Sequence, residues 1–390
     1  MKKQNVYFHL VVFAITILTV ASMTVYGNDN NLVDSSPIMG SILDLKANPH
    51  NKNELYAVVE RQGLFRSIDK GDTWIYCGAG LPNDDLMGID FDPVERVIYA
   101  RTSSALFRSY DFIKWVKLAE FRRPNILLIQ STDQSKILYM RTADGLLFSK
   151  DEHAWEKIDR PESYSKVDFY IIAIDRADPG IVYFAVIRPL TFVLAEEVEA
   201  YKSSGLWKAD DSGIYRSSDQ GKTVEKILST RSDVLSISPS VADVMYSVGT
   251  DNIDVSRILK SNDRGASWEV QGKLEFIKIE KLFLSPVDHN ILYAKTIDNR
   301  HLQNINYDPL DNRPLDDRPQ AKPLLLRSSN GGKTWQDISS SSPFNKAFNS
   351  RVITILPDPL NPKVLYVGAA NGLFKSTDVG KTWKAIQISK

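Results

Sequence analysis

The chain has 390 residues, of which 43% are hydrophobic, so it is long enough to bury a sizeable core in one large domain or two medium ones. Its 48 Lys and Arg residues balance 48 Asp and Glu residues, so the composition gives no support to a nucleic acid or another polyanion as partner. The single cysteine, Cys77, excludes an intramolecular disulfide.

The N-terminus has a basic start followed by an apolar run over residues 6–21 and then small residues. This pattern is typical of a secretory signal peptide, and it predicts a signal segment over residues 1–27 and a linker over 28–40. The alternative is an uncleaved anchor, because residues 6–26 approach the length of a helix that crosses a bilayer. Both interpretations place the folded part outside the cytoplasm, in the periplasm or secreted.

From Ser41 onward the chain repeats a unit of four short predicted strands without helical periodicity. The first strand ends near a proline, as in the segment 42–49. The second strand carries a Leu-Tyr or Ile-Tyr pair. The third strand runs into a polar turn, and the fourth begins at a tryptophan.

The polar turn is clearest in two copies, GLFRSIDKGDTW at 63–74 and GLFKSTDVGKTW at 372–383. In the second copy, Ser376 and Asp378 can accept hydrogen bonds from backbone amides of the turn, and Gly380 supplies a positive φ. The ring of Trp383 can fill the gap to a neighbouring sheet. The residues predicted to build these turns are Ser67, Asp69, Gly71, Trp74, Asp111, Asp151, Asp219, Asp263, Asn330, Ser376, Asp378, Gly380 and Trp383.

The motif S-x-D-x-G-x-T-W is similar to the Asp-box, or bacterial neuraminidase repeat, of sialidases, sortilin-type receptors, xyloglucanases and photosystem II assembly-factor propellers. Seven copies predict an all-β fold over residues 41–390, a seven-bladed β-propeller with four-stranded antiparallel blades. A two-sheet sandwich would not explain seven self-similar hairpins. For function the resemblance implies a range: protein or glycan binding in some members and hydrolysis in others.

Several copies depart from the consensus. The second and third copies are one residue short and lack the glycine, the fourth has Val224 in place of tryptophan, and the sixth has Asn330 in place of aspartate. Such decay is expected of a structural turn whose neighbours can compensate for it. It argues against the aspartates being catalytic residues or metal ligands.

Two insertions, 188–212 and 296–323, fall between the second and third strands of their repeats. In an up-and-down blade they leave the face opposite the polar turns, where they would flank the fifth blade and the mouth of a central pocket. Long loops on a rigid scaffold commonly carry function, and aromatic and arginine side chains commonly anchor partners. The insertions contain the binding candidates Tyr201, Trp207, Tyr307, Arg313 and Arg318. The alternative is that they are variable loops without a ligand.

Enzymatic signatures are sparse. The segment 121–124 partly matches the sialidase F/Y-R-I-P motif, and Arg122 could bind a carboxylate through two hydrogen bonds, although the segment follows the second repeat instead of preceding the first. The insertions contain acidic residues, so a glycoside hydrolase is the alternative function. The five histidines lack metal-ligand spacing, so no metal and no cofactor are expected. The sequence therefore favours an exported, non-enzymatic binding or assembly scaffold for a protein or glycan, with membrane contact only through an uncleaved N-terminal segment.

Overall fold

The computed structural model describes residues 40–132, 135–158, 168–175, 178, 180–187, 212–232, 234–250, 255–275, 277–298, 322–339, 342 and 352–388. The predicted signal segment and nearly all of the linker lie outside these residues. One short 3-10 helix, η1 (Asn83–Asp85), occurs in the described part of the chain. No helix in that part is long and apolar enough to cross a membrane.

The strands form seven antiparallel sheets of four, and in every sheet the strands are neighbours in chain order. We call these sheets blades one to seven. Blades one to three contain β1 (Ile42–Asn48), β2 (Asn51–Val59), β3 (Gly63–Ser67) and β4 (Ile75–Tyr76); β5 (Leu86–Phe91), β6 (Ile98–Thr102), β7 (Ala105–Ser109) and β8 (Val116–Glu120); and β9 (Ile126–Ser131), β10 (Lys136–Thr142), β11 (Gly145–Ser149) and β12 (Glu156–Lys157). Blades four and five contain β13 (Asp168–Ile174), β14 (Val182–Ile187), β15 (Gly213–Ser217) and β16 (Glu225–Leu228); and β17 (Leu235–Ile237), β18 (Met245–Thr250), β19 (Val255–Ser261) and β20 (Glu269–Glu275). Blades six and seven contain β21 (Ile277–Leu284), β22 (Leu292–Asp298), β23 (Lys322–Ser328) and β24 (Gln336–Asp337); and β25 (Val352–Pro357), β26 (Leu365–Ala369), β27 (Gly372–Ser376) and β28 (Lys384–Ile386).

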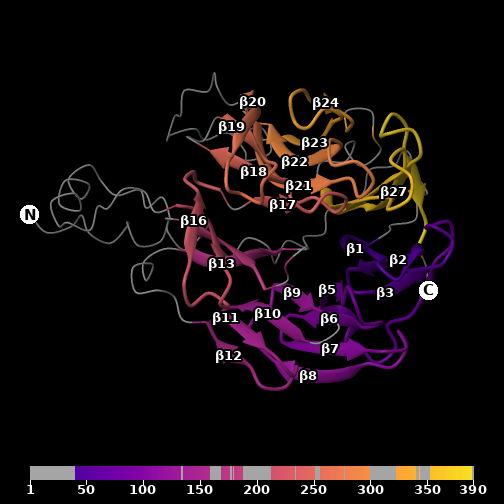
Figure 1. Cartoon of the computed structure of the whole chain (residues 1–390). Coiled ribbons are helices and arrows are strands. Elements are labelled where there is room, and N and C mark those ends of the chain that lie inside the picture. The colour runs from indigo at the N-terminus through magenta and orange to yellow at the C-terminus, as the bar shows by residue number, and fades with distance from the viewer. Residues whose placement is uncertain are drawn as a thin grey trace, which may run out of the picture. The chain divides into compact units, whose positions relative to one another are not determined.

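The seven first strands follow one another around a ring, and β25 of blade seven lies against β1 of blade one (Figure 1). The predicted all-β, seven-bladed propeller is therefore confirmed. Each second strand lies between two others, and its faces are covered by adjacent blades. This explains why β2 and β26 contain long buried apolar runs, such as Leu55–Val59 and Leu365–Ala369, instead of an alternating pattern.

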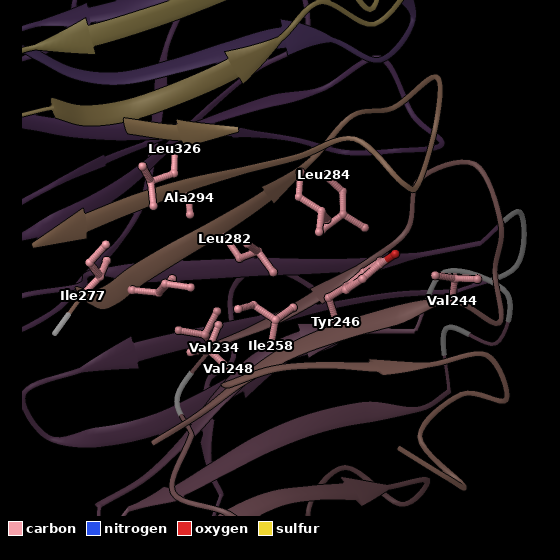
Figure 2. Close-up of a cluster of buried hydrophobic side chains, with 12 residues drawn as sticks. Val234, Val244, Tyr246, Val248, Ile258, Ile277, Leu282, Leu284, Ala294 and Leu326 are labelled. Atoms are coloured by element: carbon pink, nitrogen blue, oxygen red, sulfur yellow. The ribbon is translucent and has the colours of Figure 1, made fainter. Parts of the chain in front are cut away.

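The hydrophobic core of the described residues divides into seven clusters, each between two adjacent blades. Figure 2 shows the cluster between blades five and six, where Ile258 of β19 packs near Leu282 of β21. The residue that follows each polar turn packs on the cluster shared with the preceding blade: Trp74, Trp115, Trp155, Val224, Trp268, Trp335 and Trp383. Trp74 is buried, and Trp383 is only partly buried.

The ring closes without exchange of strands in the described part of the chain, because blades one and seven are each built from one continuous segment. Their contact is made by side chains. The hydroxyl of Tyr366 donates to the Lys70 carbonyl at 2.7 Å, and the Lys375 ammonium forms an ion pair with Asp72 at 2.8 Å. An apolar cluster of residues from both blades, including the buried Ile42, fills the space between them.

Each blade buries one tyrosine on its second strand. The seven are Tyr56, Tyr99, Tyr139, Tyr183, Tyr246, Tyr293 and Tyr366, each at most 1% exposed. Burying a tyrosine side chain costs little when its hydroxyl group makes a hydrogen bond. Tyr183 donates to Asp175 at 2.7 Å and Tyr139 to Gln130 at 3.1 Å, whereas the hydroxyl of Tyr246 has no partner among the described residues.

We call the segment from the serine at the end of each third strand to the residue before the fourth strand the repeat turn. In blade one the Gly71 amide donates to Ser67 Oγ at 2.7 Å and the Thr73 amide to Asp69 Oδ1 at 2.9 Å. The Trp74 indole donates to the Gly71 carbonyl at 3.2 Å. Blades four to seven repeat the glycine–serine and aspartate or asparagine bonds, so these five turns are complete. Gly380 has φ +86°, in the left-handed region that favours glycine.

The repeat turns of blades two and three are short. Each has one residue of positive φ where the complete turns have two, and that residue is Phe112 in blade two and Glu152 in blade three. Both side chains are buried against the tyrosine of the preceding blade. The ring centre of Phe112 lies 5.9 Å from that of Tyr56, and the Glu152 carboxylate accepts the hydroxyl of Tyr99.

Candidate functional site

The two faces of the propeller are set by strand direction. Repeat turns follow the third strands and lie on the same face as the turns after the first strands; we call this the turn face. Connections between second and third strands lie on the opposite face. Both long segments leave from that opposite face, one from β14 to β15 and one from β22 to β23. We call it the insertion face.

The strands that flank the second insertion are longer than the sequence predicts. Strand β22 extends to Asp298 and β23 begins at Lys322, so both strands take in residues of the predicted segment 296–323. The binding candidates in the insertions, Tyr201, Trp207, Tyr307, Arg313 and Arg318, lie outside the described residues.

Arg122 lies in the link between blades two and three. Its guanidinium donates to Asp144 at 2.9 Å, and its carbonyl accepts the Ala143 amide at 2.7 Å. Because Asp144 belongs to the connection between the second and third strands of blade three, Arg122 lies on the insertion face. The side chains of Arg122 and Asp144 are 74% and 54% exposed, so the pair is solvated and available at the rim.

Arg122 also borders a groove of about 540 Å³ between the outer parts of blades two and three. Its aromatic wall is formed by Phe121 and Trp155, whose ring centres are 4.9 Å apart in an edge-to-face arrangement. Glu120 and His153 complete a polar border. The structure therefore groups Arg122 with an acidic partner and two aromatic rings, and not with other arginines of the described residues.

The central channel has a charged side that the sequence reasoning missed. Lys46 of β1 forms an ion pair with Asp90 of β5 at 3.3 Å, and Arg101 of β6 reaches Asp90 at 2.9 Å. Asp44 accepts the Ile89 amide at 3.0 Å, which joins β1 to β5. With Lys281 of β21, the side chains of Asp44, Lys46, Asp90 and Arg101 form what we call the charged arc.

Lys281 differs from the other cations of the charged arc because it has no carboxylate partner among the described residues. Burial lowers the pKa of Lys281, and the positive charge of Lys46 lowers it further. The charges of Asp44 and Asp90 have the opposite effect on Lys46 and raise its pKa. Asp44 and Asp90 act in the same direction on Lys281, but burial and the charges of Lys46 and Lys295 outweigh them, so its pKa is lowered.

Backbone irregularities accompany the charged arc. The pairing of the first strand with the second shifts by one residue at Leu43, Met87, Glu280 and Ile353, in blades one, two, six and seven, and also at Ile172 of the apolar side, in blade four. Such bulges change the direction of the following side chains. The glycine after one of them, Gly88, makes room for a neighbour, since an added Cβ would lie 2.5 Å from an Arg101 nitrogen.

The remaining side of the channel is apolar and borders a cavity of about 650 Å³. Its wall is formed by Leu128, Ile129, Ile172, Ile174 and Ile237 of blades three, four and five, which we call the apolar arc. Lys46 and Asp90 line the same cavity. Most of the lining residues lie in the second halves of the first strands and just beyond them, so this cavity is toward the turn face, at the opposite end of the channel from the insertions.

The aspartates of the complete turns are engaged within their own turns. The Thr382 hydroxyl and amide both donate to Asp378, and these bonds lower the pKa of Asp378 to about 2. Asn330 accepts the Thr334 amide at 3.0 Å in the same way without a charge. The aspartates therefore stabilise turns. Among the described residues, no group of three or more His, Cys, Asp or Glu side chains is arranged to hold a metal ion.

No protein-family model matches the chain, and no curated protein matches it. Solved structures match its fold. A GH74 xyloglucanase from Xanthomonas campestris matches at 16% identity with a TM-score of 0.59, over 88% of this chain and 53% of the enzyme. A GH74 enzyme from Niastella koreensis matches at 16% identity with a TM-score of 0.58, over 89% of this chain and 54% of that enzyme. YCF48 from Cyanidioschyzon merolae matches at 12% identity with a TM-score of 0.53, over 87% of this chain and 96% of YCF48.

These comparisons and the seven four-stranded sheets define the class of protein: a seven-bladed β-propeller. At such low identity the likeness concerns the fold. The chain spans about half the length of the two GH74 structures, and it matches YCF48 over nearly the whole of that protein.

Proposed function

We propose that this propeller is an exported, non-enzymatic scaffold that binds a protein or a glycan on its insertion face. The observation that carries the proposal is that both long connections leave from one face of a ring that is complete without them. Every blade is paired within itself, and the connections contribute no strand to any of the seven sheets in the described residues.

The other connections between second and third strands are much shorter. In blade one, β2 ends at Val59 and β3 begins at Gly63; in blade seven, β26 ends at Ala369 and β27 begins at Gly372. A scaffold does not need the additional length, and loop closure penalises it only weakly. The long segments carry the aromatic and arginine residues that suit a binding surface, and Arg122 lies at the rim of the same face.

The charged arc supports binding in preference to hydrolysis. Glycoside hydrolysis uses two carboxyl groups, one as proton donor and one as nucleophile or base. In the described channel, Asp90 is held by Lys46 and Arg101, and Asp44 accepts a backbone amide. These carboxylates have structural partners.

The test replaces the two insertions with the chain's own short connections. Residues 188–212 would be exchanged for Glu60-Arg61-Gln62 of blade one, and residues 299–321 for Ala370-Asn371 of blade seven. Binding of the full chain and of this variant would be compared on a glycan array and in a pull-down from the envelope fraction of its own cell. We expect the variant to keep the melting transition of the full chain and to lose binding of the partner.

Single substitutions sharpen the test. Trp207→Ala and Tyr307→Ala should each reduce the affinity for the partner found with the full chain by roughly tenfold or more, as is usual when an aromatic anchor is removed. Glu197→Ala is the matched control in the first insertion and should leave affinity unchanged. Full binding by the exchanged variant would overturn the proposal, and so would cleavage of a sialoside or another glycan that is lost in Arg122→Ala.

A further inference from the structure

The groove between blades two and three has the size of a ligand site. Its volume of about 540 Å³ lies within the range of ligand pockets. Its lining includes Asp144, in the connection after β10 on the insertion face, and His153, in the repeat turn of blade three. Strand β11, which separates them, has five residues and is about 16 Å long. The groove therefore follows the outer side of the ring, and an elongated ligand could contact both ends.

The floor of the groove is apolar and is held by the core. Phe121, Leu147 and Trp155 line it, are partly buried, and pack on the cluster between blades two and three. The indole nitrogen of Trp155 is buried without a hydrogen bond among the described residues, whereas the Trp74 indole donates to Gly71 of its own turn. The exposed part of the Trp155 ring is therefore carbon. Side chains already fixed by packing lose little freedom when a ligand binds, so this floor is preorganised for a flat apolar surface.

The border of the groove is polar, and its charges are compensated. The Glu120 carboxylate forms an ion pair with Lys117, and Asp144 forms one with Arg122 at 2.9 Å. The side chains of Glu120 and Asp144 are 76% and 54% exposed, so both pairs are weak and their oxygens can accept further hydrogen bonds. Both carboxylates of the lining already have a cation. The border therefore favours a neutral ligand with several hydroxyl groups over an anion or a cation.

A sugar ring has this combination of properties, with carbon-bound hydrogens on its face and hydroxyl groups around its edge. We propose that the groove between blades two and three binds a neutral oligosaccharide. The face of one sugar ring lies against Phe121 and Trp155, and its hydroxyl groups bond to Glu120, Asp144 and Arg122. This site goes beyond the proposed partner surface, because it follows the outer side of the ring and uses no residue of either insertion.

Trisaccharides of different charge test the class of ligand. Triacetylchitotriose, maltotriose and mannotriose are neutral, chitotriose carries amino groups, and trigalacturonate carries carboxylates. Each would be titrated into the full chain by calorimetry. We expect at least one neutral trisaccharide to bind with a stoichiometry of one, and both charged ones to bind roughly tenfold or more weakly than it does. Binding of none of the three neutral trisaccharides, or equal binding of a charged one, would overturn the proposal.

Substitutions locate the site. Glu120→Ala and Arg122→Ala remove exposed side chains and should each reduce the affinity for the neutral trisaccharide by roughly fivefold or more. Glu275→Ala is the matched control, because Glu275 also ends a fourth strand and forms an exposed ion pair, with Lys273. It should leave the affinity unchanged.

The aromatic floor has its own pair of variants. Trp155→Leu should abolish trisaccharide binding, whereas Trp268→Leu, at the equivalent position of blade five, should preserve it; thermal unfolding checks that each variant is folded. If Trp155→Leu does not fold, the Glu120 and Arg122 variants still decide the outcome, since unchanged affinity in both would overturn the proposal. The variant without insertions should still bind the trisaccharide. Binding that is lost in that variant and kept in Glu120→Ala would place the sugar on the partner surface instead of in the groove, so the two proposals fail separately.

Discussion

The complete repeat turn of blade one and the short repeat turn of blade three both bind the tyrosine hydroxyl of the preceding blade, but with different groups. In blade one the first residue of positive φ is the exposed Lys70, and its backbone carbonyl accepts a hydrogen bond from the hydroxyl of Tyr366 of blade seven. In blade three the equivalent residue is Glu152, and its buried side chain accepts the hydroxyl of Tyr99 from blade two. In these two turns the tyrosine hydroxyl has a hydrogen-bond partner, which is a backbone carbonyl in blade one and a side chain in blade three.

In the short turns, buried side-chain contacts therefore replace the hydrogen bonds that the missing glycine would make. The Glu152 carboxylate also forms ion pairs with Arg108 and with Lys136, and Lys136 reaches the buried Asp92 at 3.0 Å. In blade two, Phe112 places an aromatic ring where the complete turns place backbone. The loss of glycine in these two repeats coincides with a gain of buried side-chain contact.

Removing Glu152 should have the largest effect. Glu152→Ala leaves the hydroxyl of Tyr99 and the charges of Arg108 and Lys136 without their shared partner in a largely buried site. We expect a loss of about 3–5 kcal/mol in the free energy of unfolding, as when one member of a buried ion pair is deleted. Lys70→Ala, at the equivalent position of a complete turn, should cost less than about 0.5 kcal/mol because its carbonyl remains. Urea unfolding of both variants would check this, and equal losses would contradict the comparison.

The tyrosine hydroxyls test the other side of the contact. Tyr366→Phe removes the donor that joins blade seven to the Lys70 carbonyl, and we expect a cost of about 1–2 kcal/mol. Tyr246→Phe removes a buried hydroxyl that has no partner among the described residues, so its cost should be near zero or slightly negative. A similar loss in both variants, measured by thermal and urea unfolding, would show that the Lys70 contact does not stabilise the ring.

The sequence predicted the features that depend on repetition. Seven copies of the turn, the Leu-Tyr or Ile-Tyr pairs and the proline after the first strand were sufficient for the number of blades and strands. The fourth and fifth blades lack the Leu-Tyr or Ile-Tyr pair, because Val182 precedes Tyr183 and Met245 precedes Tyr246.

The charged arc could not be predicted because its members are far apart in the chain and lie in strands whose sequences suggest ordinary buried structure. Asp44 and Lys281 follow bulges at Leu43 and Glu280, and a bulge changes which side a residue faces without a clear sequence signal. The role of Glu152 could not be predicted for a related reason. The sequence showed that its turn is one residue short, but its partner Tyr99 lies in another blade, 53 residues away in the chain.

Val379 offers a smaller effect within a complete turn. It has φ +61°, although branching at Cβ makes this left-handed conformation unfavourable. Val379→Asn should stabilise the protein by about 1 kcal/mol, because asparagine tolerates positive φ. Val379→Ile keeps the branched carbon and should leave stability nearly unchanged. If both variants melt at the temperature of the parent chain, the backbone at this turn is not strained.

The acid sensitivity of the complete turns is the subtlest expected difference. Hydrogen bonds from the Thr382 hydroxyl and amide lower the pKa of Asp378 to about 2, below the value of about 3.9 for an aspartate in an unfolded chain. Because the folded pKa is the lower one, the contribution to stability is fully present above about pH 4 and is lost as the pH falls through about 2. Asp378→Asn should therefore reduce the decrease in unfolding free energy between pH 5 and pH 2.5, with little change at pH 7.

Blade six supplies the reverse experiment, because Asn330 already occupies the equivalent position and keeps the bonds to Ser328 and Thr334. Asn330→Asp should steepen the same decrease by adding a carboxylate that the Thr334 hydroxyl and amide can stabilise. The two substitutions together should move the acid sensitivity from one turn to the other and leave its total size nearly constant. Urea unfolding at both pH values measures this, and slopes that do not respond in opposite directions would show that the acid sensitivity does not arise in these turns.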